Sequence, residues 1–549
     1  MSRNIQNPIL PGFHPDPSIL RVGRDFYIAT STFEWWPGVR IHHSRDLVHW
    51  QHLSYALTRT SQLDMRGNPD SCGIWAPCLS HHAGTYYLVF TNVRSSLGSY
   101  KDAHNYIATA EHPAGPWSEP VYVHSRGFDP SLFHDDDGRS WFVSMQWNHR
   151  PGHDPFAGIV LQEWDKDRRA LTGSVQTIFT GTSLGVTEGP HLYRRDGWYY
   201  LLVAEGGTFY EHAVTIARSR RIEGPYEVSP HHPLLTAHRQ SPAGLQRAGH
   251  ASLVDTGTGQ WFMAHLCGRP LEWRTDPPAD APVGEYAGLH CPLGRETALQ
   301  AIEWTADGWP RLAGGGTAPH RAAPAPDLPA APIEQEPPRD DFDHAALNPH
   351  LNTLRAPADA SWLSLTERPG WLRLRGRESL MSTFDQSLVA RRQQHFRCDV
   401  STRVDFEPTH FQHCAGLLAY YNTQNHAYLH LTHDDAAGGK VLVLAVNDRG
   451  ILREPVKPVP VPSGPVDMKV VFHADSFRFF HRLGDADWQA IGEPLPTAML
   501  SDEHATHFDQ GTPRSFGFTG NFIGLACQDL SGGRLHADFD WFEYRPVQD

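Results

Sequence analysis

The chain has 549 residues, which corresponds to two to four domains of ordinary size. Hydrophobic residues make up 40% and charged residues 20%, as in folded soluble proteins, and this excludes disorder over most of the length. The 47 Lys and Arg against 61 Asp and Glu give a net charge of −14, which would repel phosphate backbones and anionic membranes. We therefore expect neither nucleic acid nor a membrane as a partner.

Five similar segments occupy residues 1–313, and they begin about 60 residues apart at Asp16, Trp75, Asp129, Glu188 and His250. Each opens with a polar or aromatic residue, continues through a small residue or Pro and an apolar pair, and ends in a turn followed by an aromatic-aliphatic strand. A unit of about 60 residues with this much strand signal matches a four-stranded propeller blade. The repeat therefore predicts a five-bladed β-propeller.

Residues 314–338 are rich in Pro and Ala and contain no Phe, Trp or Tyr, which predicts a semi-rigid linker. Residues 339–549 contain several segments in which apolar and polar residues alternate with a period of two, which predicts a β-sandwich domain. We expect this domain to give structural support, and a carbohydrate-binding module is the alternative.

Seven scattered cysteines, an odd number, fit reduced thiols better than a disulfide framework. The first twenty residues contain no apolar run typical of a secretory signal, and no apolar segment is long enough to span a membrane. These features predict a cytoplasmic protein.

The innermost strand of each propeller blade lines a central channel, so the residues that open the five units should meet at one axial cavity. Three of them, Asp16, Asp129 and Glu188, are carboxylic acids. Glycoside hydrolysis needs one protonated carboxyl group to donate to the leaving oxygen and one ionised group to activate water or attack the sugar. The negative charge of a third carboxylate would raise the pKa of the acid.

Aromatic residues are abundant, and Phe33, Trp75 and Trp147 could provide apolar walls for sugar rings. None of the 35 histidines stands in an HExxH motif, and the Asp-Gly in HDDDG at 134–138 is typical of a hairpin turn rather than of calcium ligands. The sequence therefore predicts no metal site.

Several long motifs carry a family resemblance: GFHPDPSI, STFEWWPGVRIHHSRDLVHW, SQLDMRGNPDSCGIWAPCLS, GFDPSLFHDDDG, VTEGPHLY, AEGGTFYEHAVTIARS, AGHASLV and CPLGRET. They resemble glycoside hydrolase family 43, specifically its two-domain β-xylosidase branch. The resemblance continues to GFTGNFIGLACQDLSGG near the C-terminus. It implies a five-bladed propeller followed by a concanavalin-like β-sandwich.

The activity implied by the resemblance is inverting, exo-acting hydrolysis of β-1,4-xylooligosaccharides from the non-reducing end, with α-L-arabinofuranosides as side substrates. Asp16 resembles the general base, Glu188 the general acid and Asp129 the residue that tunes the pKa of the acid. Arg295 resembles a residue that binds the innermost sugar. His250 matches a histidine that holds the base or, in some members, a divalent cation such as calcium, although no cofactor is required.

An inverting site should separate the carboxyl groups of Asp16 and Glu188 by roughly 6.5 to 9.5 Å, because a water molecule must fit beside the sugar. The resemblance further implies that an aromatic loop of the second domain, matched by Phe518 to Phe522, closes the pocket so that only a chain end enters. It also implies homo-oligomers, either dimers or tetramers.

Two other functions remain open from the sequence. A dedicated α-L-arabinofuranosidase could use the same scaffold, although the STFEWWPGV and GNPDSCGIWAP motifs and the second domain favour xylose. A non-catalytic sugar-binding propeller is the alternative from another class, but it would need neither three carboxylates nor Arg295.

Overall fold

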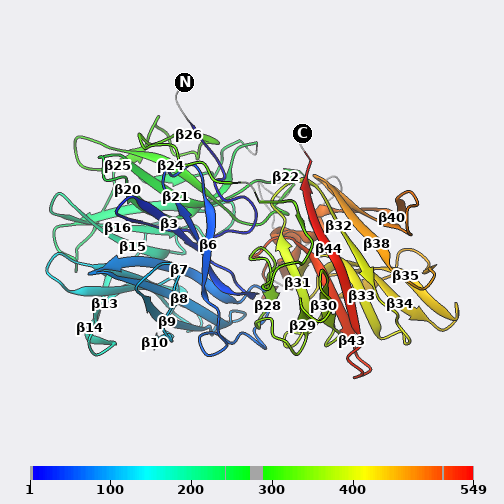
Figure 1. Ribbon diagram of the computed structural model, residues 1–549. Coiled ribbons are helices and arrows are strands. Elements are labelled where there is room, and N and C mark those ends of the chain that lie inside the picture. The colour runs from blue at the N-terminus through cyan, green and yellow to red at the C-terminus, as the bar shows by residue number, and fades with distance from the viewer. Residues whose placement is uncertain (1–3, 242, 273–287, 335, 510–511, 548–549) are drawn as a thin grey trace. The chain divides into compact units, whose positions relative to one another are not determined.

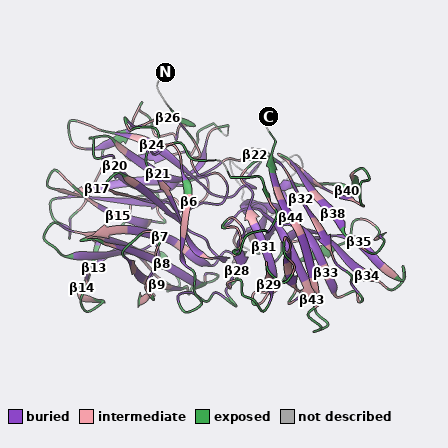
Figure 2. Cartoon of the chain, viewed as in Figure 1, coloured by how far each residue is buried: buried purple, intermediate pink, exposed green. Residues whose placement is uncertain are grey.

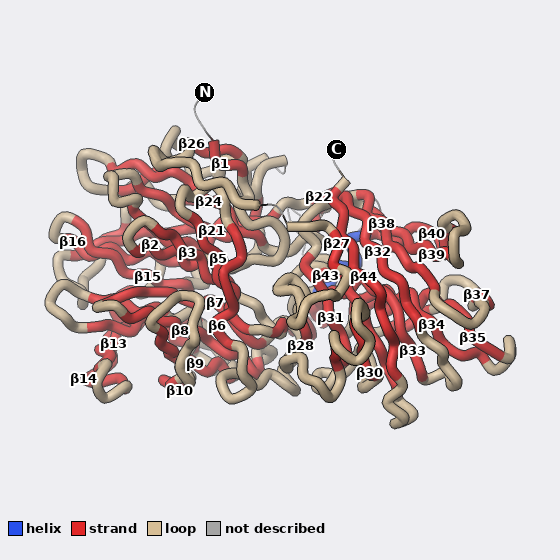
Figure 3. Tube along the Cα trace, in the orientation of Figure 1, coloured by secondary structure: helices blue, strands red, loops and turns tan. Residues whose placement is uncertain are grey.

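Strands dominate the structure (Figure 3), and the all-β prediction is confirmed. Helix in the described residues is limited to η1 (Thr497–Leu500) and α1 (Asp502–Ala505). The computed structural model describes residues 4–241, 243–272, 288–334, 336–509 and 512–547. It divides into two compact units, of which the first comprises residues 1–63, 72–270 and 295–333 and the second residues 64–71, 271–294 and 334–549.

Five antiparallel sheets form most of the first unit among the described residues (Figure 1). In each sheet the strand that comes first in the sequence is the innermost. Their strands are, sheet by sheet, β2 (Ser18–Val22), β3 (Asp25–Thr30), β5 (Gly38–Ser44), β6 (Gln51–Leu57); β7 (Gly73–His82), β8 (Thr85–Ser95), β9 (Asp102–Ala110), β10 (Val121–His124); β11 (Ser131–His134), β12 (Ser140–Trp147), β13 (Phe156–Asp165), β14 (Ala170–Phe179); β15 (Glu188–Arg195), β16 (Trp198–Glu205), β17 (Ala213–Ser219), β18 (Glu227–Val228), β19 (Leu235–Thr236); β20 (Gln246–Asp255), β21 (Trp261–Gly268), β24 (Glu296–Trp304), β25 (Pro310–Leu312).

The five inner strands close a ring. β2 packs against β7, β7 against β11, β11 against β15, β15 against β20, and β20 against β2. Apolar side chains fill the spaces between neighbouring sheets; Leu202 and Ile216 of the fourth sheet, for example, share a buried cluster with Leu253 and Met263 of the fifth. The second strands of the sheets, such as β8 and β16, are buried on both faces (Figure 2), which explains their continuous aromatic-aliphatic sequences. The predicted five-bladed propeller is confirmed.

At one matching position of all five repeats, in the inner strand or just before it, the residue has left-handed backbone angles. These residues are Asp16 (φ 55°), Ala76 (φ 28°), Asp129 (φ 52°), Gly189 (φ 59°) and His250 (φ 42°). Residues other than Gly rarely adopt such angles, and they concentrate at functional sites. The five repeats align differently from the sequence-based expectation. Trp75 and Glu188 were expected at this shared position, but each lies one residue before it. Pairing register also shifts just after Trp75 and Glu188, as in a β-bulge that redirects side chains.

Part of the segment predicted as a linker lies on the first unit. β26 (Ala322–Pro324) pairs with β1 (Asn4–Gln6), and the backbone N–H of Ala331 donates to Asp46 Oδ2 (2.9 Å). The predicted domain boundaries themselves stay a prediction.

Two antiparallel sheets enclose the core of the second unit, as expected of a β-sandwich. The strands of the first sheet are β27 (Arg339–Asp340), β29 (Leu363–Ser364), β30 (Leu372–Arg375), β32 (Arg397–Asp405), β38 (Val466–His473), β39 (Ser476–Arg482), β40 (Gln489–Pro496) and β44 (His536–Pro546). Those of the second are β31 (Ser387–Arg392), β33 (His413–Asn422), β34 (Asn425–Asp434), β35 (Gly439–Asp448), β36 (Ile451–Arg453), β37 (Val459–Pro460) and β43 (Phe522–Asp529). Short strands elsewhere in the chain are β4 (Trp35–Trp36), β22 (Leu271–Glu272), β23 (Leu289–His290), β28 (Thr353–Leu354), β41 (His507–Asp509) and β42 (Thr512–Ser515).

Two segments from the N-terminal half of the chain, residues 64–71 and 271–294, belong to the second unit. In residues 64–71, Asp70 forms an ion pair with the fully buried Arg355 (2.7 Å). In residues 271–294, the carbonyl of Pro292 accepts a hydrogen bond from the backbone of Asn521 (3.0 Å). The second unit is therefore assembled from three separate stretches of the chain.

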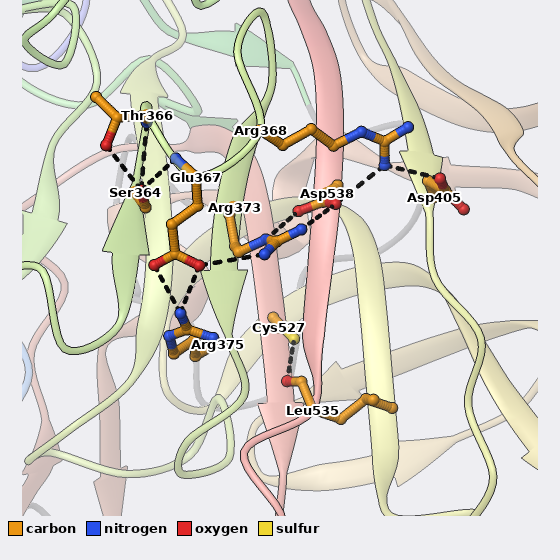
Figure 4. A network of polar contacts seen from close by, with 10 residues as sticks. All are labelled: Ser364, Thr366, Glu367, Arg368, Arg373, Arg375, Asp405, Cys527, Leu535 and Asp538. Atoms are coloured by element: carbon orange, nitrogen blue, oxygen red, sulfur yellow. Dashed lines mark hydrogen bonds and ion pairs between the residues drawn. The ribbon is translucent and has the colours of Figure 1, made fainter.

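Asp538 is the centre of a polar network in the first sheet of the sandwich (Figure 4). The nearly buried carboxylate accepts two hydrogen bonds from Arg373 (2.7 and 2.8 Å) and one from Arg368 (3.0 Å). Arg368 also donates to Asp405 (2.8 Å), and Glu367 accepts from Arg375 (2.6 Å). Burial raises the pKa of Asp538, but the hydrogen bonds from Arg373 and Arg368 outweigh it and leave the pKa below its ordinary value.

All seven cysteines are free thiols, and six of them are buried. In the part of the chain that the structure describes, no helix has the length and apolar character needed to cross a bilayer.

Candidate active site

The structure brings the three predicted carboxylates together at the start of three inner strands. Asp16 and Asp129 each lie two residues before a strand, β2 and β11, and Glu188 is the first residue of β15. The charges of Glu188 and Asp16 both raise the pKa of Asp129. The ring of inner strands gathers acids that are far apart in the sequence.

Asp16 is held on both carboxylate oxygens. The hydroxyl of Ser31 donates to Oδ2 (2.6 Å) and the guanidinium of Arg295 donates to Oδ1 (3.0 Å). Arg295 also donates to the hydroxyl of Thr208 (3.1 Å), and the side chains of Asp16 and Arg295 are only 6% and 4% exposed. A charge-assisted pair at this level of burial fixes the carboxylate in place.

Glu188 is suited to carry a proton near neutral pH. Burial, followed by the negative charge of Asp16, raises its pKa from 4.5 to about 7, although Arg295 and Lys101 act in the opposite direction. About half of the Glu188 side chains would then be protonated at pH 7. The side chain keeps part of its surface accessible to solvent, as a proton donor to a ligand requires.

Asp129 has a pKa well above its ordinary value, because it is buried and lies close to Glu188 and Asp16. A hydrogen bond from the backbone of Gly189 and the charge of Arg295 only partly offset this effect. We expected the charge of Asp129 to raise the pKa of Glu188. The repulsion acts in both directions and also disfavours ionisation of Asp129, and the effect of Asp129 on Glu188 stays a prediction.

His250 lies beside Asp129, with 3.9 Å between its Nδ1 and Asp129 Oδ2. Burial lowers the pKa of His250, which favours a neutral imidazole. Gly189 packs against its ring: a Cβ atom on Gly189 would lie 3.0 Å from the ring and would force a shift. Among the described residues no group of three or more His, Cys, Asp and Glu side chains is arranged to hold a metal ion.

A row of aromatic rings extends from the carboxylates. Phe33 lies 5.8 Å from Trp75, Trp75 lies 5.5 Å from Phe128, and Phe128 lies 6.1 Å from Trp147. The guanidinium of Arg295 sits 5.1 Å from the Phe33 ring, so the row starts at the Asp16 ion pair. Phe33, Trp75 and Trp147, predicted as sugar-binding residues, are thus neighbours in one wall.

The other end of the row lies near Glu188. Lys101, which lowers the pKa of Glu188, places its ammonium group 4.4 Å from the ring centroid of Trp147. The indole N–H of Trp147 donates to the carbonyl of Ser99 (2.8 Å). The aromatic wall therefore connects the surroundings of the two reactive carboxyl groups.

Sequence analysis missed several contributors to this site. Phe128 directly precedes Asp129, and Ser31 lies two residues before Phe33 in the same motif, so neighbouring positions could have suggested both. Nothing in the sequence pointed to Thr208 or Lys101, because their relation to the acids depends on how the blades pack.

The second unit contains Phe518 and Phe522. The Phe518 ring stacks on Phe516 (5.3 Å between centroids), and its backbone N–H donates to Ser71 Oγ (3.2 Å). Phe522 is fully buried in β43, with the guanidinium of Arg392 5.2 Å from its ring. Their role in substrate binding stays a prediction.

A groove of about 280 Å³ on the sandwich includes Trp488 and Trp541. Cationic groups cover both rings at 4.4 to 4.8 Å from the ring centroids, namely Lys469 and Arg482 over Trp488, and Arg339 and Arg403 over Trp541. Such rings offer little open face to a sugar, which favours the structural role for this unit.

The HDDDG segment forms a hairpin, as predicted, because it connects β11 to β12 with His134 paired to Ser140. The carboxylate of Asp135 accepts from Arg194 (2.8 Å) and from the hydroxyl of Tyr199 (2.7 Å) in the next blade. The turn therefore contributes to the packing between blades.

Two protein-family models match the chain, one in each half. The profile of glycosyl hydrolases family 43 matches residues 5–310, and that of the beta xylosidase C-terminal concanavalin A-like domain matches residues 339–545. The chain belongs to glycoside hydrolase family 43. Within this family it has the two-domain architecture, as the resemblance implied, and enzymes of the family need no cofactor.

Three family 43 relatives illustrate the similarity. A xylosidase/arabinosidase 43B from Humicola insolens is 48% identical, with 99% of this chain and 98% of the relative covered. A beta-xylosidase from Bacillus subtilis (strain 168) is 46% identical, with 98% and 99% covered. The crystal structure of a xylan beta-1,4-xylosidase from Bacillus halodurans C-125 superposes with a TM-score of 0.93 at 54% identity, covering 98% of this chain and 100% of that one.

Proposed function

We propose that this chain is an inverting, exo-acting β-xylosidase that releases xylose from the non-reducing end of β-1,4-xylooligosaccharides. The observation that carries the proposal is the pairing of unlike carboxyl groups: Glu188 with a pKa of about 7 beside an Asp16 held by Arg295 and Ser31. Two carboxyl groups kept in different protonation states are what acid–base cleavage of a glycoside requires. Full-length relatives named as xylosidases support the choice of sugar.

The chemistry proceeds in one displacement. Asp16 accepts a proton from a water molecule as the water oxygen bonds to C1 of the terminal xylose. Glu188 donates its proton to the glycosidic oxygen as the bond from C1 to that oxygen breaks. The products are α-xylose and an oligosaccharide shortened by one sugar, and no covalent intermediate forms.

Arg295 and Asp129 help to maintain the positions and protonation of the reacting carboxyl groups. Arg295 orients Asp16 through a hydrogen bond to Oδ1. Asp129 stays close to the acid without adding a full negative charge, because its own pKa is raised. After each turnover the proton taken up by Asp16 must leave and Glu188 must be reprotonated, which bulk solvent can do.

Proton NMR of xylobiose hydrolysis tests the mechanism. We expect the signal of α-xylose to appear first and the β anomer to grow only through mutarotation. Initial formation of β-xylose would instead mean retention and would contradict the assigned roles. A lack of any sugar release would support a non-catalytic binding protein.

A second activity, on α-L-arabinofuranosides, is favoured by the relative named xylosidase/arabinosidase 43B. Comparing kcat/KM on 4-nitrophenyl β-D-xylopyranoside and 4-nitrophenyl α-L-arabinofuranoside ranks the two activities. We expect the xyloside to be the better substrate, and the opposite order would identify an arabinofuranosidase.

Further parts of the proposal rest on the sequence and the family resemblance. We propose a cytoplasmic dimer or tetramer that binds neither nucleic acid nor membranes, and light scattering measures its mass in solution. A divalent cation such as calcium near His250 would act on site geometry and take no part in proton transfer. Activity that survives dialysis against a chelator would rule out dependence on such a cation.

A further inference from the structure

A second glutamate lies behind the acid. Glu205, the last residue of β16, is fully buried and accepts four hydrogen bonds. The donors are the backbone N–H (2.8 Å) and hydroxyl (2.7 Å) of Thr182, the hydroxyl of Thr187 (2.8 Å) and the hydroxyl of Thr215 (2.5 Å). Within the described part of the chain, no Lys or Arg forms an ion pair with Glu205, so these hydrogen bonds are what compensates for its burial.

Three of the four donated hydrogen bonds come from the segment that leads into Glu188. Thr182 lies six residues before the acid, and Thr187 is its immediate neighbour. The carbonyl of Gly185, between them, accepts from the backbone N–H of Gly206 (2.8 Å). Glu188 itself pairs with Ala204, the residue next to Glu205.

This segment has few other means of holding its shape. Leu184 and Val186 are exposed, at 39% and 56%, so apolar burial contributes little to its order. Gly181 allows its backbone to come close, since a Cβ atom there would lie 2.5 Å from the hydroxyl oxygen of Thr187 and 3.4 Å from Oε1 of Glu205. The Glu205 carboxylate therefore anchors residues 182–187 at both ends, through Thr182 and Thr187, beside the backbone hydrogen bonds of Gly185.

We propose that Glu205 is a positioning residue for the proton donor: it fixes residues 182–187 and thereby the place of the Glu188 carboxyl group relative to the glycosidic oxygen. This inference rests on the proposed function, in which Glu188 is the acid. The two oxygens of Glu205 accept all four hydrogen bonds, whereas a Gln side chain offers one acceptor oxygen and an NH2 group, so its introduction leaves buried donors without a partner. The backbone before Glu188 is then no longer held in one position.

The consequence depends on the leaving group. Xylobiose has a poor leaving group that must be protonated as the bond breaks, so a displaced acid slows its hydrolysis strongly. An activated aryl xyloside such as 4-nitrophenyl β-D-xylopyranoside leaves without that proton. A positioning role predicts unequal losses on the two substrates, whereas a purely structural role predicts equal losses.

The test measures kcat and KM of Glu205→Gln on both substrates. We expect kcat/KM to fall at least tenfold on xylobiose, mainly through kcat, and less than threefold on the aryl xyloside. Thr187→Val, which removes one donor, should give the same pattern more weakly, and Thr187→Ser, which keeps the hydroxyl, should restore activity. Equal losses on both substrates, or no loss on xylobiose, would overturn the proposal.

Asp46→Asn is the matched control. Asp46 is another fully buried carboxylate of the propeller, and it accepts from the backbone of Val48 and His49. Its replacement should change both substrates alike. If Glu205→Gln does not fold, as judged by circular dichroism, Thr187→Val decides the question. If Glu188→Gln also shows equal losses, the acid assignment fails; if only Glu205→Gln does, the positioning role alone fails.

Discussion

The protonation of Glu188 should set the high-pH limit of activity. Its pKa of about 7, against the ordinary 4.5, corresponds to about 300-fold tighter proton binding, or about 3 kcal/mol. From this value, about nine tenths of the side chains carry the proton at pH 6, about half at pH 7 and about a tenth at pH 8. Because the acid works only when protonated, kcat/KM on xylobiose should fall as the pH rises through 7.

Replacement of Glu188 by Gln should remove this dependence together with most of the activity. General acid catalysis contributes about 10² to 10⁴-fold, so we expect a loss of this size on xylobiose. The aryl xyloside should lose far less, because its leaving group needs no proton. The residual activity on the aryl xyloside should no longer decrease near pH 7.

The assay is kcat/KM between pH 5 and 9, since this quantity reports the free enzyme. Glu303→Gln is a suitable control, because Glu303 is an exposed residue of β24 in an ion pair with Arg311 (3.1 Å). We expect it to behave like the unmodified enzyme. A fall in wild-type kcat/KM as the pH rises through 5 instead of through 7, or a fall near pH 7 that persists in Glu188→Gln, would refute the assignment.

Asp16→Asn should reduce kcat/KM by about 10² to 10⁴-fold on both substrates alike, because the attacking water needs a base whatever the leaving group; unequal losses would argue against this role. The free energy of unfolding of the wild type should fall as the pH rises from 4.5 through 7, because the folded state disfavours ionised Glu188. At pH 8, Glu188→Gln should therefore be more stable than the wild type by about 1 to 3 kcal/mol, as measured by urea unfolding. Equal stability would contradict the raised pKa. Asp538→Asn should destabilise the sandwich by about 2 kcal/mol, and Glu367→Gln, in more exposed pairs, should destabilise it less. A reversed order would disprove the central position of Asp538.

The prediction from sequence succeeded where a signal recurs along the chain. Repeated turns and aromatic strands predicted the five blades, and the acids were found because Asp16, Asp129 and Glu188 open three of the repeats. The alignment was one residue off at Trp75 and Glu188, because bulges and left-handed residues are properties of the backbone that residue types only suggest.

Electrostatic roles were harder to predict. The sequence indicated that three acids meet, but it could not indicate which charge acts on which group. In the structure, burial and the charge of Asp16 raise the pKa of Glu188, and burial together with the charges of Glu188 and Asp16 raises that of Asp129.

The amino-acid sequence by itself determined the all-β class, the number of blades and the family, and it predicted three acids at the start of inner strands. Each of these depends on a local pattern that repeats or on long motifs. Only the tertiary structure decided the partners of those acids: Thr208, Lys101 and the Glu205 anchor. These contacts join residues from different strands and loops, and their energies depend on distance and on exclusion of water, which exist only after the blades have packed.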